Sequence, residues 1–330
     1  MQRRNFTRQL TRTTIGVAAM ISLTGAWAQG DAARPIHVVV GFPAGGGTDV
    51  FARAVAQGLA LELGQPTVVD NKPGAGGVLA SQSLRQAAPD GYTLLAGSTS
   101  TQVIAPLLYA RAPYQPSDFT PIAHIARVGI VLVAHPSAPF DDVAGLVRYA
   151  RAHPGQLNYA SGGNGVTNHL AMELLKSRAG VHLVHIPYRG SAPALADVIG
   201  GQVSLMFDSV ASSGPQIRAG KVKALGIAGP ARLEALPGVP TLAESGLAPL
   251  KDFDVTGWVA LYGPKGLAPA TVQRLEAATA RVLANADIAE RFALQGASPH
   301  FLDSAALAAY ERSESAKWAQ AVQHSGARLD

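Results

Sequence analysis

The sequence of 330 residues predicts an α/β protein with two lobes, each a mostly parallel sheet with flanking helices, joined by two hinge strands. Three observations lead to this prediction. Short β-rich runs alternate with segments of helical periodicity along most of the chain. Two such alternating units are separated by two long β-like runs, residues 122–134 and 254–262. Glycine-rich loops stand where several strands would pass into helices.

Residues 1–28 have the composition of an export signal. Arg3 and Arg4 give a positive start, residues 15–23 are uncharged and mostly apolar, and Ala26-Trp27-Ala28 offers small residues for cleavage. The apolar run is about half the ~20 residues that a membrane-spanning helix needs. The paired arginines resemble a twin-arginine signal, with ordinary secretion as the alternative. We therefore expect a signal peptide over residues 1–28 and a soluble mature protein in the periplasm.

The composition excludes several classes of protein. The chain has no cysteine, which rules out a disulfide framework, a cysteine-bound metal or iron–sulfur site, a thiol nucleophile and a lipid anchor on cysteine. Residues 1–28 contain four arginines and no acid, and without them 23 basic residues remain against 22 acidic ones. A nucleic-acid partner requires a basic stripe, so we expect none.

The first alternating unit is expected at residues 31–125. A helix from about Thr48 has Phe51, Val55 and Leu59 on one face and ends at Gly64. The other elements expected in this unit are a strand at 36–41, a strand at 67–69, a helix ending near 86, a strand at 92–96 and a helix at 101–109.

The second unit is expected at residues 126–255, after which the chain returns to the first lobe at 260–330. Two crossings between the lobes would make a hinge, with a ligand cleft where the loops of both sheets meet. The elements expected are helices at 141–152, 165–178 and 192–199, strands at 157–160, 181–186, 203–207 and 222–227, a turn at 236–246, and closing helices at 269–285, 288–295 and 304–325.

The loop at residues 41–49 could bind an anion. It contains three successive glycines and opens a helix, so backbone N–H groups and the positive helix end could point at one ligand. No Gly-Lys-Ser/Thr follows, and the glycine spacing is not that of a dinucleotide-binding loop. The alternative is a tight turn in which Thr48 or Asp49 caps the helix.

Hydroxyl-bearing residues follow two further strands. Residues 98–101 could donate to an oxyanion or merely cap a helix. Residues 158–169 run from a strand through a glycine-rich turn into a helix, and here Ser161 and Thr167 are the better ligand contacts. For His169, a buried position with a hydrogen bond to backbone is the more economical interpretation.

Three more polar residues stand at strand ends. Tyr188 could wall the cleft, and Arg189 could pair with a carboxylate or simply remain exposed. Asp208 could accept a hydrogen bond from a ligand ammonium or cap the segment that follows.

A periplasmic serine hydrolase or esterase is the competing function. A nucleophile elbow requires Gly-x-Ser-x-Gly, and neither Ser161 nor Ser98 stands in that pattern or has an evident base beside it. No His-Glu-x-x-His occurs, and His182 and His185 would face opposite sides of a strand. We therefore expect no enzymatic activity, no cofactor and no metal.

Several motifs, in the same order along the chain, resemble the Bug family, the extracytoplasmic solute receptors of tripartite tricarboxylate transporters. The resemblance covers essentially the whole mature chain. The motifs that carry it are Phe42-Pro43-Ala44-Gly45-Gly46-Gly47-Thr48-Asp49, Asn71-Lys72-Pro73-Gly74-Ala75-Gly76-Gly77, Tyr159-Ala160-Ser161 with Gly165 and His169, Pro187-Tyr188-Arg189-Gly190, Gly200-Gly201-Gln202 before Phe207-Asp208, residues 236–246, and Gly257-Trp258.

The resemblance implies a periplasmic-binding-protein-like fold that closes on a di- or tricarboxylate or an acidic amino acid, held by backbone N–H groups, hydroxyls and waters. It also implies delivery to membrane permease subunits or signalling to a sensor kinase, and we expect a monomer. Residues 98–101 depart from the polar run often found in the family. The expected ligand-binding residues are Phe42, Pro43, Ala44, Gly45, Gly46, Thr48, Ser98, Thr99, Ser161, Gly162, Gly165, Thr167, His169, Tyr188 and Asp208.

Overall fold

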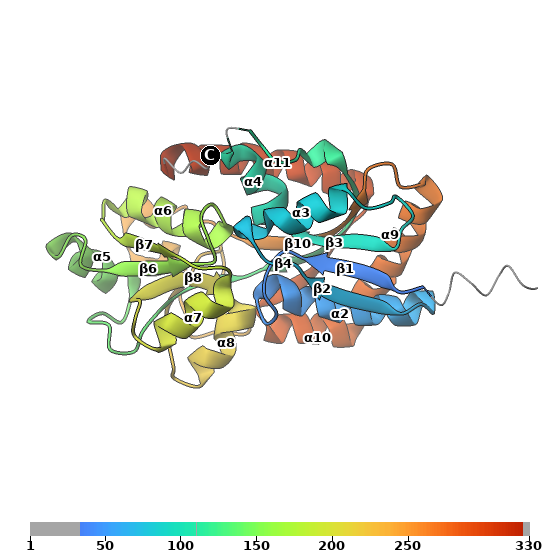
Figure 1. Cartoon of the computed structure of the whole chain (residues 1–330). Helices are drawn as coiled ribbons and strands as arrows, with labels where there is room; N and C mark the ends of the chain where they lie inside the picture. Colours follow the sequence, from blue (N-terminus) through green and yellow to red (C-terminus); the bar gives the residue numbers. More distant parts are fainter. Residues whose placement is uncertain (1–33, 110, 326–330) are drawn as a thin grey trace, which may run out of the picture.

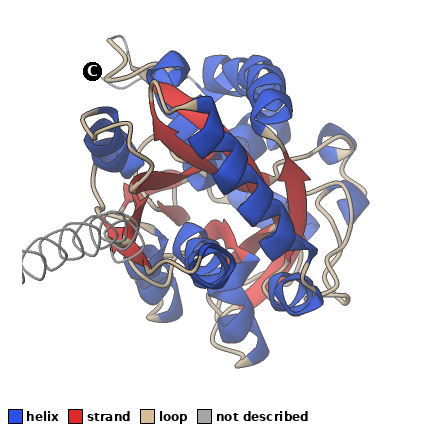
Figure 2. Ribbon diagram, turned by 90° about the vertical axis from the view of Figure 1, so that its right-hand side faces the viewer, coloured by secondary structure: helices blue, strands red, loops and turns tan. Residues whose placement is uncertain are grey.

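Two β-sheets lie side by side in the computed structural model, which describes residues 34–109 and 111–325 (Figure 1). Helices flank both sheets (Figure 2). The predicted signal peptide and its paired arginines lie outside the described residues. In the part of the chain that the structure describes, every helix is too short or too polar to cross a membrane.

The six-stranded sheet has the order β11-β4-β10-β3-β1-β2. Its strands are β1 (Ile36–Val40), β2 (Thr67–Asn71), β3 (Thr93–Ser98), β4 (Phe119–Val128), β10 (Gly257–Pro264) and β11 (Ala297–Leu302). The helical segments of this lobe are α2 (Gly47–Leu63), α3 (Val78–Arg85), the π-type turn η2 (Thr99–Ile104), α4 (Ala105–Leu108), α9 (Pro269–Ala284), α10 (Ala286–Leu294) and α11 (Ser304–Ser325).

The five-stranded sheet has the order β7-β6-β8-β5-β9. Its strands are β5 (Ile130–Ala134), β6 (Asn158–Ser161), β7 (Val184–Pro187), β8 (Leu205–Ser209) and β9 (Lys223–Ile227). Its helices are α5 (Val143–Ala152), α6 (Thr167–Ala179), α7 (Ser191–Ile199) and α8 (Val210–Arg218).

The expectation of mostly parallel sheets is wrong, because both sheets are mixed. Strand β1 pairs in parallel with β2 and β3, and β6 pairs in parallel with β7 and β8. The strands nearest the crossings, β10 in one sheet and β5 in the other, are antiparallel to both of their neighbours. Each of them enters its sheet from the other lobe, and so runs against the strands already there.

The long β-like run at residues 122–134 is two strands, which belong to different sheets and meet at Gly129. The N–H of Gly129 donates to the carbonyl of Gly296 over 2.9 Å, and its own carbonyl accepts from Val210 over 3.0 Å. A side chain has no room at this point, because a Cβ would lie 2.6 Å from the oxygen of Gly296. The second crossing runs beside the first, since Gly257 at the start of β10 pairs with Val128 at the end of β4. Just before it, the N–H of Val255 donates to the carbonyl of Ala228 over 2.8 Å.

One α-helix and one strand, α8 and β11, are absent from the sequence prediction. Helix α8 contains Gly214 and Pro215, which weaken its helical pattern, and its first turn is capped by the hydroxyl of Ser209. Strand β11 lies at the edge of its sheet and contains Pro299, a residue that edge strands tolerate.

Helix α11 belongs to the first lobe by its packing on β4, and it also contacts α6 of the second lobe. Figure 1 shows it running over both lobes. Its buried Glu314 accepts hydrogen bonds from the indole nitrogens of Trp258 on β10 and Trp318 on its own helix, over 3.3 and 3.1 Å. Through Glu314, the C-terminal helix α11 is therefore hydrogen-bonded to Trp258 of β10, a residue that lines the pocket.

Candidate functional site

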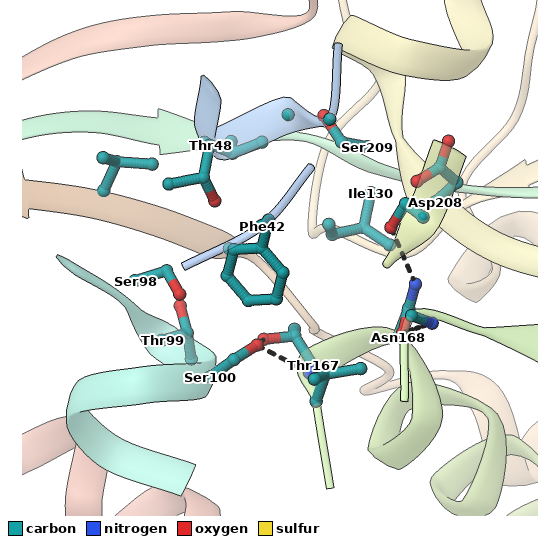
Figure 3. Close-up of a pocket in the computed structure, with 18 of the residues that line it drawn as sticks. Phe42, Thr48, Ser98, Thr99, Ser100, Ile130, Thr167, Asn168, Asp208 and Ser209 are labelled. Carbon is teal, nitrogen blue, oxygen red and sulfur yellow. Dashed lines mark hydrogen bonds between the residues drawn. The ribbon is translucent and has the colours of Figure 1, made fainter. Parts of the chain in front are cut away.

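A pocket lies between the two sheets, where loops at the ends of β1, β3, β6 and β8 approach one another (Figure 3). The crossing strands contribute Val128, Ile130, Gly257 and Val259 to its wall. A ligand cleft is expected at this junction, since strand ends and their loops from both lobes meet there.

The amino end of α2 opens into the pocket. Gly46 is the N-cap residue and offers no side chain to the first turn, and Gly47 and Thr48 line the pocket. The first N–H groups of a helix have no partner within it, so this end can hold an anion. The capping alternative for Asp49 is wrong, because its side chain reaches back to the N–H of Gly45 instead.

Asp49 fixes the conformation of the first loop, a role that its position in the sequence does not reveal. One carboxylate oxygen accepts from Gly45 N and Arg53 Nε, both over 2.9 Å, and the other accepts from Asn71 Nδ2 over 2.8 Å. Asn71 also donates to the carbonyl of Phe42 over 2.9 Å. Burial alone would raise the pKa of Asp49, but these hydrogen bonds and the Arg53 charge outweigh it and lower the pKa.

The hydroxyls of Ser98, Thr99 and Ser100, which follow one another at the end of β3, have three different surroundings. Ser98 Oγ is buried, lines the pocket and has no hydrogen-bond partner. Thr99 Oγ1 accepts from the N–H of Trp258 over 3.0 Å, which ties the turn to β10. Ser100 crosses to the other lobe, where its Oγ accepts from Thr167 N and shares a hydrogen bond with Thr167 Oγ1, each over 2.9 Å.

The loop of the second lobe presents Gly162 and Thr167 to the pocket. Ser161 is fully buried behind this loop and is absent from the pocket lining. His169 is also buried, and its Nδ1 accepts from Gly165 N over 3.0 Å, as preferred from the sequence. Ser161, Gly165 and His169 therefore lie where they shape the loop rather than where they face the pocket.

The expectation that no base stands beside Ser161 is wrong. Its Oγ lies 2.6 Å from His185 Nε2 and also donates to the carbonyl of Gly163. Burial and the neighbouring His169 lower the pKa of His185 to about 4, which makes it a weak base at neutral pH. Because Ser161 has no exposed surface, a substrate in the pocket could not reach this pair.

Four of the predicted residues lie at the mouth of the cleft. Pro43 and Tyr188 line a neighbouring groove, and the Tyr188 hydroxyl donates to Asp197 over 2.6 Å. Ala44 and Gly45 are exposed. The groove adjoins the pocket, since Phe42 and Gly162 line both.

Asp208 lines the pocket and is 1% exposed. Its Oδ2 accepts from the hydroxyls of Ser212 and Ser213, while its Oδ1 has no partner. Burial raises the pKa of this carboxyl to about 6, against the opposing effect of the Ser212 and Ser213 hydroxyls, the Ser209 N–H and the Ser191 hydroxyl. The capping alternative is wrong here as well, because α8 is capped by Ser209.

The pocket is otherwise uncharged. Among the described residues that line it, Asp208 is the one with an ionisable side chain. The described part of the chain holds no cluster of three or more His, Cys, Asp or Glu suited to a metal ion. A bound anion would therefore be held by N–H groups and hydroxyls.

Comparison with known proteins identifies the family. The model described as the tripartite tricarboxylate transporter family receptor matches residues 51–327. The chain belongs to this family. Protein BugT of Bordetella pertussis is 36% identical to it over 318 residues, which cover 96% of this chain and 95% of BugT.

Solved structures of similar sequence share the fold. The periplasmic binding protein BugD is 34% identical, with a TM-score of 0.85 over 90% of this chain and 99% of BugD. Rpa4515 of R. palustris, solved with adipate, is 32% identical with a TM-score of 0.87 over 92% and 100% of the two chains. MatC of Rhodopseudomonas palustris, solved with bound malate, is 35% identical with a TM-score of 0.81 over 88% and 99%.

These findings confirm the Bug-family prediction and the two-lobed α/β fold. The family receptor is a periplasmic solute-binding protein and not an enzyme. Nothing in the comparisons supports the hydrolase alternative.

Proposed function

We propose that this receptor captures a small carboxylate between its lobes and delivers it to the permease subunits of a tripartite tricarboxylate transporter. The observation that carries the proposal is the meeting of two helix ends, α2 from one lobe and α6 from the other, at an almost uncharged pocket. Neither N-cap residue, Gly46 or Val166, caps its helix with a side chain, and the first N–H of α6 donates to Ser100 of the other lobe. Such ends hold anions. The similar receptors solved with adipate and malate bind ligands of this class.

Capture would proceed by closure of one lobe on the other. We propose lobes of residues 31–125 plus 260–330 and of residues 126–255, with the hinge at the two crossings. In the structure β4 stays in the first sheet to Val128, and β10 enters it at Gly257. A ligand that contacts both lobes stabilises the closed state relative to the open one.

Three further parts of the proposal follow from the family and the N-terminal sequence. Residues 1–28 would direct export as a signal peptide, by the general or the twin-arginine route. The closed receptor would act as a monomer. Signalling to a sensor kinase is the alternative to delivery to a permease.

A thermal-shift screen tests the proposed function. The mature protein is unfolded, dialysed, refolded and screened against dicarboxylates, tricarboxylates and acidic amino acids, with calorimetry on each hit. A ligand at 100 times its dissociation constant should add about 2.7 kcal/mol of stability and be recovered unchanged. Failure of every carboxylate to bind, or turnover of an ester, would contradict the proposal.

A further inference from the structure

The polar atoms left unpaired in the pocket show what its ligand must supply. Among the described residues, four buried side-chain atoms lack a hydrogen-bond partner, and two of them, Ser98 Oγ and Asp208 Oδ1, belong to pocket residues. They come from opposite lobes and lie on opposite sides of the pocket (Figure 3). A buried polar atom without a partner is unfavourable, so each of these is a position where a ligand group would be stabilised.

The unpaired oxygen of Asp208 is held in position. Asp208 lies on β8 and pairs with Val131 of β5 in the middle of the second sheet. Its other carboxylate oxygen, Oδ2, accepts hydrogen bonds from the hydroxyls of Ser212 and Ser213 on α8. The carboxylate cannot turn away from the pocket without losing those two hydrogen bonds. Oδ1 is therefore a preorganised acceptor in the pocket wall.

The charge around this oxygen favours a cation over a neutral donor. The side chains that face Asp208 are the hydroxyls of Ser212 and Ser213 on α8 and Ser191 at the start of α7, and none of them is charged. The pKa of Asp208, raised by burial to about 6, still leaves it mostly ionised at neutral pH. A ligand hydroxyl would fill the free acceptor, whereas an ammonium would also neutralise the buried charge.

We infer that the pocket selects carboxylates that also carry an amino group, with the ammonium on Asp208 and a carboxylate at the helix ends of α2 and α6. This inference rests on the proposed function and adds the class of ligand. The positive helix ends and the negative Asp208 lie at different places in one pocket, and an amino acid has the matching pair of charges.

Calorimetry with matched ligands tests the inference. L-aspartate is compared with succinate, and L-glutamate with glutarate, on the refolded wild-type protein and on D208N. We expect each amino ligand to bind about 10- to 100-fold more tightly than its partner, the range for a hydrogen bond to a charged group. D208N should remove that preference, because the amino ligand loses the counter-charge of its ammonium whereas the plain dicarboxylate loses no attraction. The exposed Asp287 on α10 provides D287N as a charge-matched control that should change neither.

The pH dependence of the wild-type protein is a second test that needs no variant. The carboxylates of L-aspartate stay ionised from pH 7.5 down to about 5.5, so loss of affinity over that range reports on the protein. We expect L-aspartate to bind more weakly as the pH falls through 6, because protonated Asp208 no longer attracts an ammonium. In D208N this pH dependence should disappear.

Three results would count against the inference. Tighter binding of succinate than of L-aspartate by the wild type, equal weakening of both by D208N, or pH-independent binding of L-aspartate would each overturn it and leave the receptor function standing. Binding of no carboxylate of either kind would overturn the proposed function together with the inference.

Discussion

Asp49 is the residue on which the shape of the first ligand loop depends. It is 2% exposed and accepts hydrogen bonds from the loop, from Asn71 on β2 and from Arg53 on its own helix. The backbone N–H groups at the start of α2 can point at a ligand only while the loop keeps this form. A residue that never touches the ligand therefore positions the groups that do.

Replacing Asp49 with alanine should lower both stability and ligand affinity. Loss of hydrogen bonds to a buried charged group typically costs about 1.5–3 kcal/mol, and the exposed Arg53 adds little to this because water screens it. The folded pKa lies below the usual 3.8, so the stabilisation is complete above that pH and is lost as the pH falls through the folded pKa. Denaturant unfolding at pH 7 and at pH 3 measures the difference, with D287N as the control. Equal stability of the wild type and D49A at pH 7 would contradict this role.

Ser100 joins the two lobes, so its hydroxyl should contribute to closure. It bonds both the N–H and the hydroxyl of Thr167, at the amino end of α6. We expect S100A to weaken ligand binding by about 2- to 10-fold through loss of a hydrogen bond in the closed state alone. The unfolding temperature without ligand should stay within a degree or two. The exposed Ser117 supplies S117A as a control, and an unchanged dissociation constant in S100A would show that this bond does not favour closure.

At the scale of whole elements, the facing surfaces of the lobes approach so closely that a side chain is excluded at several points. A Cβ on Gly47, at the start of α2, would lie 2.6 Å from Ser209 Oγ of the other lobe. One on Gly190 would lie 2.5 Å from Pro43 Cδ. These glycines allow the amino end of a helix and a loop to meet across the cleft.

The variant G47A should separate closure from folding. Gly47 has helical geometry and alanine is the better helix former, so the ligand-free protein should be as stable as the wild type or slightly more so. Ligand affinity should fall at least 10-fold, because the added methyl group strikes Ser209 as the lobes close. Calorimetry and thermal unfolding check both halves of this expectation. Gly238 has open space around its Cβ position, so G238A is the matched control, and wild-type affinity in G47A would argue against this contact.

The elements were predictable where local pattern decides them, and less so where tertiary contacts do. Helix α2 has Phe51, Val55 and Leu59 buried on one face, as its periodicity indicated. The run at 122–134 reads as one strand because it is mostly apolar, with interruptions at His124, Arg127 and Gly129, yet the chain changes sheet at Gly129. The glycine by itself does not reveal that change, because it depends on the packing of Gly296 and Leu233 around Gly129.

In the candidate site, too, some features follow from local sequence and others from tertiary contacts. A pocket lies at the glycine-rich loops that follow the strands, and this position could be predicted because the loop signal is local. Which hydroxyl faces the pocket depends on neighbours far away in the sequence. Ser161 is drawn into the second lobe by His185, and Thr99 is occupied by β10, which leaves Ser98 open and Ser100 to bridge the lobes.

At the scale of the whole molecule, closure of the two lobes can be measured by disulfide cross-linking. The chain contains no cysteine, so a pair of introduced cysteines can react only with each other within the molecule. The oxygens of Ser100 and Thr167 lie 2.9 Å apart across the cleft. The double variant S100C/T167C should therefore form a disulfide when the lobes are closed and not when they are open. The two positions belong to different lobes, so the rate of cross-linking reports how much of the protein is closed.

We expect ligand to accelerate formation of this disulfide, because binding shifts the population toward the closed state. Ligand present during oxidation should stay bound through gel filtration and be released on reduction, since neither lobe can then move away. Non-reducing electrophoresis measures the cross-link, and each single-cysteine variant shows the background. Cross-linking at the same rate with and without a ligand that binds would mean that the lobes are closed before the ligand arrives. The clash of G47A with Ser209 would then be present without ligand, so this variant would lower the stability of the ligand-free protein as well.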